Sequence, residues 1–464
     1  MTNEQPIEPD ITPASDLPPV KTGPPLKLIV TIVLIACVGA AVLGFGVYFA
    51  FNTIKTSVGL VTSELPQAGS DRISNQIAFV GNDFNMWLVK PDGSNLHRLT
   101  TDGHAYRFPT WSPDGRWLAF LGRAEASHSV LYLSAFDQPK PTIIYDNPNG
   151  PPFYLYWSPN SRSLTFLTQE ASGLAMRQIE PDTPANQRVL SVGSPFYWAW
   201  SPASDKMVLH VGGSRAVSPE AHISLLANQA GASREELEQS PGRFQAPAWS
   251  SDGAYFYTVA ADSQGRDVIY QTDAQTLEPR QITTVSGFSH IVLSPNNRQL
   301  AYLQHSRSTN LPFGEAFIVG TDGQGKKQVI NSPVASLYWS PDGKKLALLS
   351  LTRPNEGPTA KIDGLAAPLA QSAVSLRWWV YNVENDDLQP VFTFQPTTAF
   401  LQTVPYFDQY YLSLTFWSPD SRYLVATKAL AGQNLLGAVV VIDTTGQTDP
   451  LKVGDGTIAV WSWQ

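Results

Sequence analysis

Two patterns of apolar and polar residues divide the chain. Residues 28–51 form one apolar run without a charged residue, whereas from residue 75 onward short apolar runs alternate with polar turns. The long run is typical of a membrane-spanning helix, since its residues would rise about 36 Å and a bilayer core is about 30 Å thick. The short runs show no sustained helical period, so they predict an all-β region.

The short runs follow a repeated turn motif. Its copies begin at Trp111-Ser112-Pro113-Asp114-Gly115, Trp157-Ser158-Pro159-Asn160, Trp200-Ser201-Pro202, Trp249-Ser250-Ser251-Asp252-Gly253, Leu293-Ser294-Pro295-Asn296, Trp339-Ser340-Pro341-Asp342-Gly343, Trp417-Ser418-Pro419-Asp420 and Trp461-Ser462-Trp463. The spacings are 46, 43, 49, 44, 46, 78 and 44 residues. All but one suit one four-stranded propeller blade per repeat. Pro presets the turn and Gly accepts positive φ.

The two ends of the repeat region complement each other. Gln76–Val80 has the pattern of a second strand without the motif before it, and Trp461 begins a motif without a second strand after it. The C-terminal strand is therefore predicted to complete the first blade and to hide both edges. This gives an eight-bladed β-propeller. Seven blades are the alternative, if the irregular residues 212–245 do not form a true blade.

The recurring Trp-Ser-Pro-Asp-Gly motif and the Ile-Ala-Phe-type runs resemble the TolB-like, WD40-like PD40 propeller repeat, over residues 75–464. In that family the motif is structural, because the Trp packs between blades and the Pro-Asp-Gly forms the turn. The family includes envelope interaction modules, non-catalytic domains of prolyl-oligopeptidase-like peptidases and a few lyases. The resemblance thus implies a fold and leaves the function open.

Four segments are expected. Residues 1–26, rich in Pro and acidic residues, predict a disordered tail, 27–51 a transmembrane helix, 52–74 a linker and 75–464 the propeller. The alternative anchor is a lipidated Cys37, since Leu34 to Cys37 resembles a bacterial lipobox. The expected arrangement is a single-pass membrane protein with its propeller on the extracytoplasmic side, periplasmic or extracellular.

Composition narrows the function. The net charge of −8 argues against nucleic acid as a partner, and a single Cys excludes a disulfide framework and a Cys-based zinc site. The sequence contains no Gly-x-Ser-x-Gly elbow, Walker A loop or dinucleotide-binding Gly-x-Gly-x-x-Gly. We therefore expect a non-catalytic protein without a cofactor or bound metal.

Aromatic blade-to-blade segments and two insertions predict a binding face. The insertions are Thr352–Ser375 and Gln395–Leu412, in the unit with the 78-residue spacing. The expected partner-binding residues are Tyr106, Arg107, Phe153, Tyr154, Phe196, Tyr197, Trp198, Arg243, His290, Tyr406, Phe407, Tyr410 and Tyr411. Packing between blades is the alternative for any one aromatic residue. Since Phe196, Tyr197 and Trp198 cannot all point one way in a strand, some of them should be exposed.

Six histidines map near the same face, namely His104, His128, His210, His222, His290 and His305. Only His104 and His290 are expected near the central channel, on opposite sides, which disfavours a shared metal ion. The predicted function is a membrane-anchored module for protein interaction or envelope assembly. A carbohydrate-binding or carbohydrate-cleaving envelope protein is the alternative, and cleavage would require a carboxylate pair from residues such as Asp408, Glu315 and Glu220.

Overall fold

The computed structural model describes residues 75–464, apart from 124–127, 136–139, 171–172, 216–217, 243–244, 288, 306–312 and 353–374. The chain divides into two compact units, Met1–Glu64 and Leu65–Gln464, and every described residue belongs to the second. The expected tail, membrane helix, lipidation site and linker therefore lie outside the described residues. None of the described helices has the length and apolar character needed to cross a bilayer.

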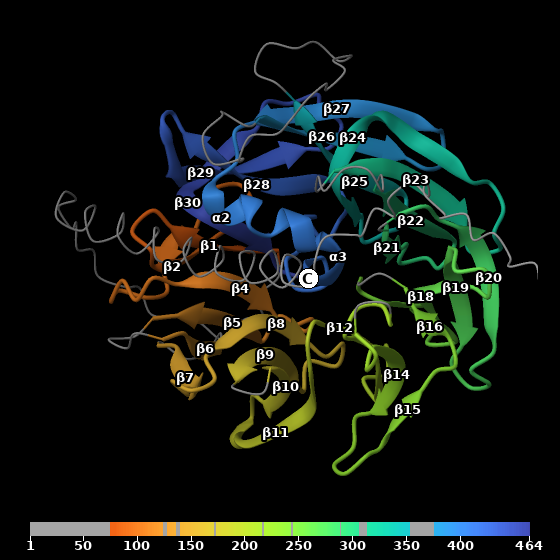
Figure 1. The fold of residues 1–464 in the computed structure, drawn as a ribbon. Helices are drawn as coiled ribbons and strands as arrows, with labels where there is room; N and C mark the ends of the chain where they lie inside the picture. Colours follow the sequence, from red (N-terminus) through yellow and green to blue (C-terminus); the bar gives the residue numbers. More distant parts are fainter. Residues whose placement is uncertain are drawn as a thin grey trace, which may run out of the picture. The chain divides into compact units, whose positions relative to one another are not determined.

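The described unit consists mainly of antiparallel sheets whose strands follow one another in sequence order (Figure 1). Three sheets have four strands each. They comprise β4 (Arg107–Trp111), β5 (Trp117–Gly122), β6 (Val130–Ala135) and β7 (Thr142–Tyr145); β8 (Pro152–Trp157), β9 (Leu164–Glu170), β10 (Gly173–Glu180) and β11 (Thr183–Gly193); and β12 (Phe196–Trp200), β13 (Lys206–Val211), β14 (His222–Ala227) and β15 (Arg234–Glu236). The irregular residues 212–245 thus contribute β14 and β15 to a regular sheet.

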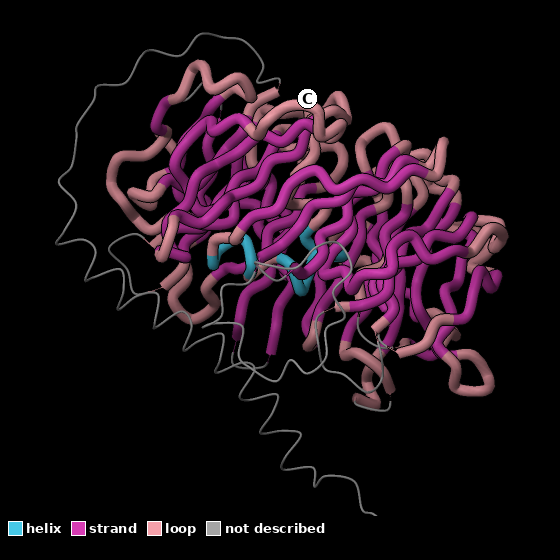
Figure 2. Tube along the Cα trace, turned by 90° about the horizontal axis from the view of Figure 1, so that it is seen from above, coloured by secondary structure: helices cyan, strands magenta, loops and turns pink. Residues whose placement is uncertain are grey.

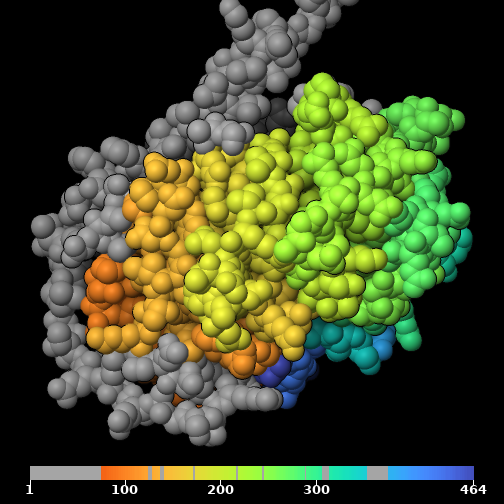
Figure 3. All heavy atoms as spheres, turned by 90° about the horizontal axis from the view of Figure 1, so that it is seen from below, coloured from red at the N-terminus to blue at the C-terminus, as the bar shows by residue number. Residues whose placement is uncertain are grey.

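The other sheets repeat the same unit with longer or broken strands. One contains β16 (Ser240–Pro241), β17 (Ala248–Trp249), β18 (Tyr255–Ala261), β19 (Asp267–Asp273) and β20 (Pro279–Thr284). The next contains β21 (Ser289–Leu293), β22 (Gln299–Gln304), β23 (Gly314–Gly320), β24 (Lys327–Trp339), β25 (Lys345–Thr352), β26 (Ser375–Asn382) and β27 (Asp387–Phe394). The last joins β28 (Tyr423–Leu430), β29 (Gln433–Asp443) and β30 (Leu451–Trp461) to β1 (Ile77–Gly81), β2 (Met86–Val89) and β3 (His97–Arg98). Figure 3 shows consecutive sheets packed side by side, from orange to green.

Strand β30 joins the two ends of the described unit. Its first half pairs with β29, for example Val439 with Gly454, and its second half pairs with β1, for example Ile77 with Trp461. The prediction that the C-terminal strand supplies the missing strand beside Gln76–Val80 is confirmed by this register. The pairing covers an edge of β1 that would otherwise expose unpaired backbone groups.

The repeated turn motif links successive repeats. In each of four copies the tryptophan Nε1 donates, at 3.0–3.2 Å, to the backbone carbonyl of the residue just before the preceding copy of the motif: Trp157 to Thr110, Trp249 to Ala199, Trp339 to Val292 and Trp417 to Tyr338. Within the turns, the serine hydroxyl donates to the following Asp or Asn, as Ser340 does to Asp342 at 2.6 Å. The motif therefore has the structural role that the repeat predicted.

One segment departs from the repeat. Between β27 and β28 the chain forms α2 (Thr398–Leu401), the 3₁₀ turn η1 (Val404–Tyr406) and α3 (Phe407–Tyr410). These short helices lie among the strands rather than outside them (Figure 2). Thr397 caps α2, because its hydroxyl accepts from the Phe400 amide at 3.3 Å. The predicted insertion Gln395–Leu412 is thus folded, whereas most of the other, Thr352–Ser375, lies outside the described residues.

Candidate functional site

Residues 395–412, called the central segment below, contact the innermost strands of several sheets. The Tyr154 hydroxyl in β8 donates to the Gln409 carbonyl at 2.9 Å, and the Gln409 side chain donates to the Phe196 carbonyl in β12 at 3.4 Å. Phe407 packs on His290 in β21, with ring centroids 5.0 Å apart. In Figure 1, α3 lies where the inner ends of the sheets converge. The segment thus occupies the centre of the described unit with the chain's own side chains.

Asp408 anchors this segment to a broken inner strand. Strands β16 and β17 pair with the same neighbour, β18, and are separated by residues 242–247. Within that gap the Ala246 amide donates to Asp408 Oδ2 at 2.8 Å. The carboxylate therefore supplies the partner that a strand would otherwise provide for a buried N–H group.

The surroundings of Asp408 are unusual for an acid. The side chain is fully buried, and its Oδ1 has no hydrogen-bond partner among the described residues while lying 3.9 Å from His290 Nε2. Burial raises the pKa of Asp408 to about 7, and backbone donors such as the Ala246 amide oppose part of this rise. Burial also lowers the pKa of His290 to about 3. The imidazole of His290 is therefore neutral at pH 7, and its Nδ1 lies 3.1 Å from Nε2 of His305.

Most of the aromatic residues predicted at the partner-binding face are buried. Phe196, Tyr197 and Trp198 are each at most 5% exposed, so the expectation that some of them are exposed is wrong. The reason is that an inner strand has no free face. Trp198 donates to Thr165 of the preceding sheet, and burial, followed by the charge of Asp408, raises the pKa of Tyr197 well above its usual value. Tyr106, Tyr154, His290 and Phe407 are buried as well.

The exposed part of the central segment is narrower than predicted. Tyr406 is 51% exposed, while Tyr410, Tyr411, Phe153 and Arg107 are partly buried. Tyr410 packs edge-on against Tyr406, with ring centroids 6.5 Å apart. Arg243 lies outside the described residues. The structure therefore gathers most of the predicted residues around one centre. Most of them are buried or partly buried and support a small exposed surface near Tyr406, so they do not form a broad exposed face.

The sequence did not single out Phe108, which is part of this support. Its ring stacks on Tyr410, with centroids 6.0 Å apart and planes 18° apart. Phe108 has a positive φ of 50° and lies where the β4–β5 register shifts between Arg107 and Thr110. The one signal in the sequence that could have identified Phe108 is its position directly after Arg107, a predicted partner-binding residue. The strand pattern alone does not reveal such a bulge.

The expectation that only His104 and His290 lie near the centre is wrong, because His305 lies beside His290, and His210 and His222 lie on paired strands. His104 Nδ1 lies 3.2 Å from the Tyr132 hydroxyl, His128 contacts Asp146, and both ring nitrogens of His210 contact backbone carbonyls. Among the described residues, no three His, Cys, Asp or Glu side chains are grouped so that they could hold a metal ion. Of the three candidate carboxylates, Asp408 is buried whereas Glu315 and Glu220 are exposed.

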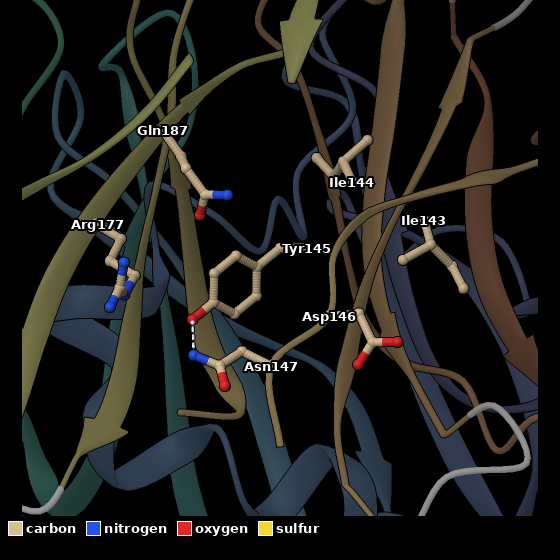
Figure 4. Close-up of a pocket in the computed structure, with 7 residues that line it drawn as sticks. All are labelled: Ile143, Ile144, Tyr145, Asp146, Asn147, Arg177 and Gln187. Atoms are coloured by element: carbon tan, nitrogen blue, oxygen red, sulfur yellow. Dashed lines mark hydrogen bonds between the residues drawn. The ribbon is translucent and has the colours of Figure 1, made fainter. Parts of the chain in front are cut away.

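A separate pocket of about 540 Å³ lies between neighbouring sheets. Ile143, Ile144 and Tyr145 belong to β7, Arg177 to β10 and Gln187 to β11, and Asp146 and Asn147 complete the lining. In Figure 4 the Tyr145 ring lies in the middle of the pocket. Arg177 and Gln187 lie on one side of it and Asp146 lies on the other. Arg177 already pairs with Glu170 at 2.5 Å, so much of its charge is neutralised within the protein.

The arrangement of successive sheets, the exchange of β30 between both ends and the inter-sheet tryptophans define the class of this protein as a β-propeller. No protein-family model matches the sequence, and a search of curated proteins found no match either.

Solved structures similar to this chain include two TolB proteins. TolB from Acinetobacter baumannii is 17% identical with a TM-score of 0.36, over 54% of this chain and 62% of that one. Putative TolB from Agrobacterium tumefaciens is 19% identical with a TM-score of 0.37, over 59% and 96%. An oligogalacturonate lyase from Vibrio parahaemolyticus is 13% identical with a TM-score of 0.43, over 83% and 86%. TolB is thus among the neighbours, as the repeat predicted, and these likenesses concern the fold alone.

Proposed function

We propose that this protein is a non-catalytic β-propeller that binds a partner protein through the exposed surface of its central segment. The observation that carries the proposal is the exposure of Tyr406 above a closely packed support. Tyr410 lies beneath it, stacked on Phe108 and in edge contact with Tyr154 at 5.0 Å. A rigid, exposed aromatic residue at the centre of a surface is characteristic of an interaction hot spot.

The proposal includes the architecture expected from the repeat. Eight units account for the described sheets if β24 and β30 each serve two units, as their pairings support. Seven of them have four strands when β16 and β17 are taken as one broken strand, and the eighth has β28, β29 and half of β30, with Trp417 paired to Leu424 through a single bridge. Residues 27–51 anchor the chain in a membrane, and the propeller faces the extracytoplasmic side. Anchoring keeps the propeller close to partners in or at the membrane, so that modest affinities suffice.

Glycan binding is the second candidate, and the pocket beside Tyr145 is the observation that favours it. Its lining combines a tyrosine with amide, carboxylate and guanidinium groups, which are the groups that hydrogen-bond sugar hydroxyls. Titration with a panel of oligosaccharides tests this candidate. Saturable binding that Gln187→Ala weakens would support it, whereas binding unchanged by Gln187→Ala would contradict this location.

The experiment for the main proposal is affinity capture of the full chain from native membranes in mild detergent. The informative variant is Tyr406→Ala, and Tyr255→Ala is the matched control because Tyr255 is also exposed, at 37%, but lies in β18. We expect a stoichiometric partner that the Tyr406 variant loses and the Tyr255 variant keeps. No partner with the wild-type chain, or a partner that both variants keep, would contradict the proposal.

A further inference from the structure

Arg107 is a partly buried cation without a carboxylate partner among the described residues. Its Nη2 donates to the Ser129 hydroxyl at 3.0 Å, and this is the one hydrogen bond of the guanidinium within the part of the chain that the structure describes. A guanidinium carries five N–H donors. Two other partly buried arginines pair with acids, Arg98 with Asp83 at 3.4 Å and Arg177 with Glu170, whereas Arg188 and Arg377 donate to neutral side chains.

A second cation makes the site of Arg107 more positive. Burial, and after it the charge of Arg123, lower the pKa of Arg107 to about 10, while Tyr410 opposes part of this shift. Among the described residues, no Asp or Glu forms an ion pair with either arginine, and the contacts of Asp408 are with Ala246 and His290 instead. Burying a charge without a counter-charge costs free energy, and an arriving anion recovers that cost.

Aromatic rings lie beside this cation. Phe108 follows Arg107 in β4 and stacks on Tyr410, and Tyr410 contacts the exposed Tyr406. A ligand that pairs with Arg107 would therefore find apolar surface next to the charge. Polypeptides combine a carboxylate with apolar side chains in this way. An anionic lipid surface typically requires a larger group of basic residues than Arg107 and Arg123.

We propose that Arg107, with Arg123 nearby, binds a carboxylate of an extended polypeptide partner whose apolar side chain lies against Phe108, Tyr410 and Tyr406. This rests on the proposed function and goes further, because it names the chemical group that is recognised. The planar guanidinium fits a carboxylate with two parallel hydrogen bonds. The carboxylate belongs either to the C-terminus of the partner or to an Asp or Glu side chain.

Small carboxylates test the site directly on the full chain. N-acetylphenylalaninate represents a C-terminal carboxylate, and N-acetylglutamic acid α-amide represents an acidic side chain. The corresponding primary amides are the uncharged controls, and inorganic phosphate tests for a general anion site. Binding is followed by the NMR shifts of ¹⁵N-labelled arginine side chains. We expect one carboxylate to bind at least about tenfold more tightly than its amide, a difference of about 1.4 kcal/mol.

The variant Arg107→Gln should abolish that difference, while Arg234→Gln should keep it, since Arg234 is exposed and paired with Glu236 at 2.8 Å. A second readout is thermal unfolding. Arg107→Gln should leave the Tm unchanged or raise it, because no carboxylate among the described residues pairs with this arginine. The proposal is overturned if carboxylates bind no better than amides, if phosphate binds more tightly than both, or if Arg107→Gln lowers the Tm as a structural arginine would.

The capture experiment separates the two proposals. If Tyr406→Ala loses the partner while Arg107→Gln retains it with wild-type affinity, the carboxylate site is wrong and the partner-binding surface stands. If Arg107→Gln reduces the affinity at least about tenfold and Arg107→Lys restores part of it, charge and geometry both contribute. If the wild-type chain captures no partner but binds the carboxylate probe, the proposed function fails and the small-molecule site remains.

Discussion

The repeated turns and the central segment obtain their stability in different ways. In the turns, the same few contacts recur from one copy of the motif to the next, such as the bond from Trp339 Nε1 to the Val292 carbonyl. In the central segment, each contact occurs once: Asp408 accepts from Ala246, Gln409 donates to Phe196, and Phe407 packs on His290. The repeat builds the sheets, and a single segment without repeat character fills the centre where they meet.

This difference teaches where to look for function in such a molecule. A repeated contact is needed for the fold at every position, so it carries little information about a ligand. The central segment places one exposed aromatic residue, Tyr406, above several buried ones. Changes in the two regions should therefore have different consequences for stability and for binding.

The largest effect on stability is expected at Phe407. Its side chain is fully buried and contacts both His290 and Tyr338. Phe407→Ala should lower the free energy of unfolding by about 3–5 kcal/mol because it leaves a cavity. Tyr406→Ala, one residue earlier, should change it by less than about 0.5 kcal/mol. Denaturant unfolding of both variants checks this, and equal losses would show that the central segment is not packed as described.

The next effect is a pH dependence that Asp408 gives to the central segment. Because burial raises the pKa of Asp408 in the folded protein to about 7, the folded state binds this proton more tightly than the unfolded state. The stabilisation that comes from protonated Asp408 is fully present below about pH 4, which is the ordinary pKa of an Asp, and is lost as the pH rises through about 7. The facing His290 stays neutral over this range, because burial lowers its pKa to about 3.

Comparison with Asp408→Asn isolates this titration. The free energy of unfolding of the wild-type chain minus that of the variant should be larger at pH 5 than at pH 8. Unfolding measured at both pH values gives the difference directly. A difference between the two proteins that does not change with pH would show that Asp408 is not a buried acid of raised pKa.

A smaller effect is expected in a single copy of the repeated turn. The Ser340 hydroxyl donates to Asp342 and accepts from the Lys345 amide at 2.9 Å, and it is fully buried. Ser340→Ala should cost about 1–2 kcal/mol, because the buried amide loses its partner. Ser94→Ala, in an exposed turn of similar chemistry, should cost less than about 0.5 kcal/mol. Equal effects would mean that exposure does not distinguish the two turns.

Much of the fold could be predicted from the sequence because the fold is repetitive. The runs Leu118–Leu121, Val268–Tyr270 and Ala438–Ile442 all lie within strands, and β30 pairs with β1 as the incomplete repeats at both ends required. Each copy of the motif predicts the same turn independently of the others. Eight imperfect copies therefore predict the repeat more securely than any single copy could.

The candidate site could be predicted only in part. The sequence indicated that Arg107, Tyr154, His290 and residues 395–412 belong to one region, because they occupy comparable places between strands. It did not show which side chains are buried, since burial at the centre depends on contacts between residues far apart in the chain. Gln409 and Phe196 are 213 residues apart, and no local pattern predicts that their groups meet.

Hydrogen–deuterium exchange of the peptides covering residues 397–414 and 245–249 tests the central claim most directly. The amides of Leu401, Tyr411 and Leu414 donate to backbone carbonyls of the central segment, and the Ala246 amide donates to Asp408. We expect both peptides to exchange as slowly as the inner strands and Asp408→Ala to release Ala246 selectively. Exchange as fast as in the largely exposed turn at residues 275–278 would contradict a central segment packed into the middle of the propeller.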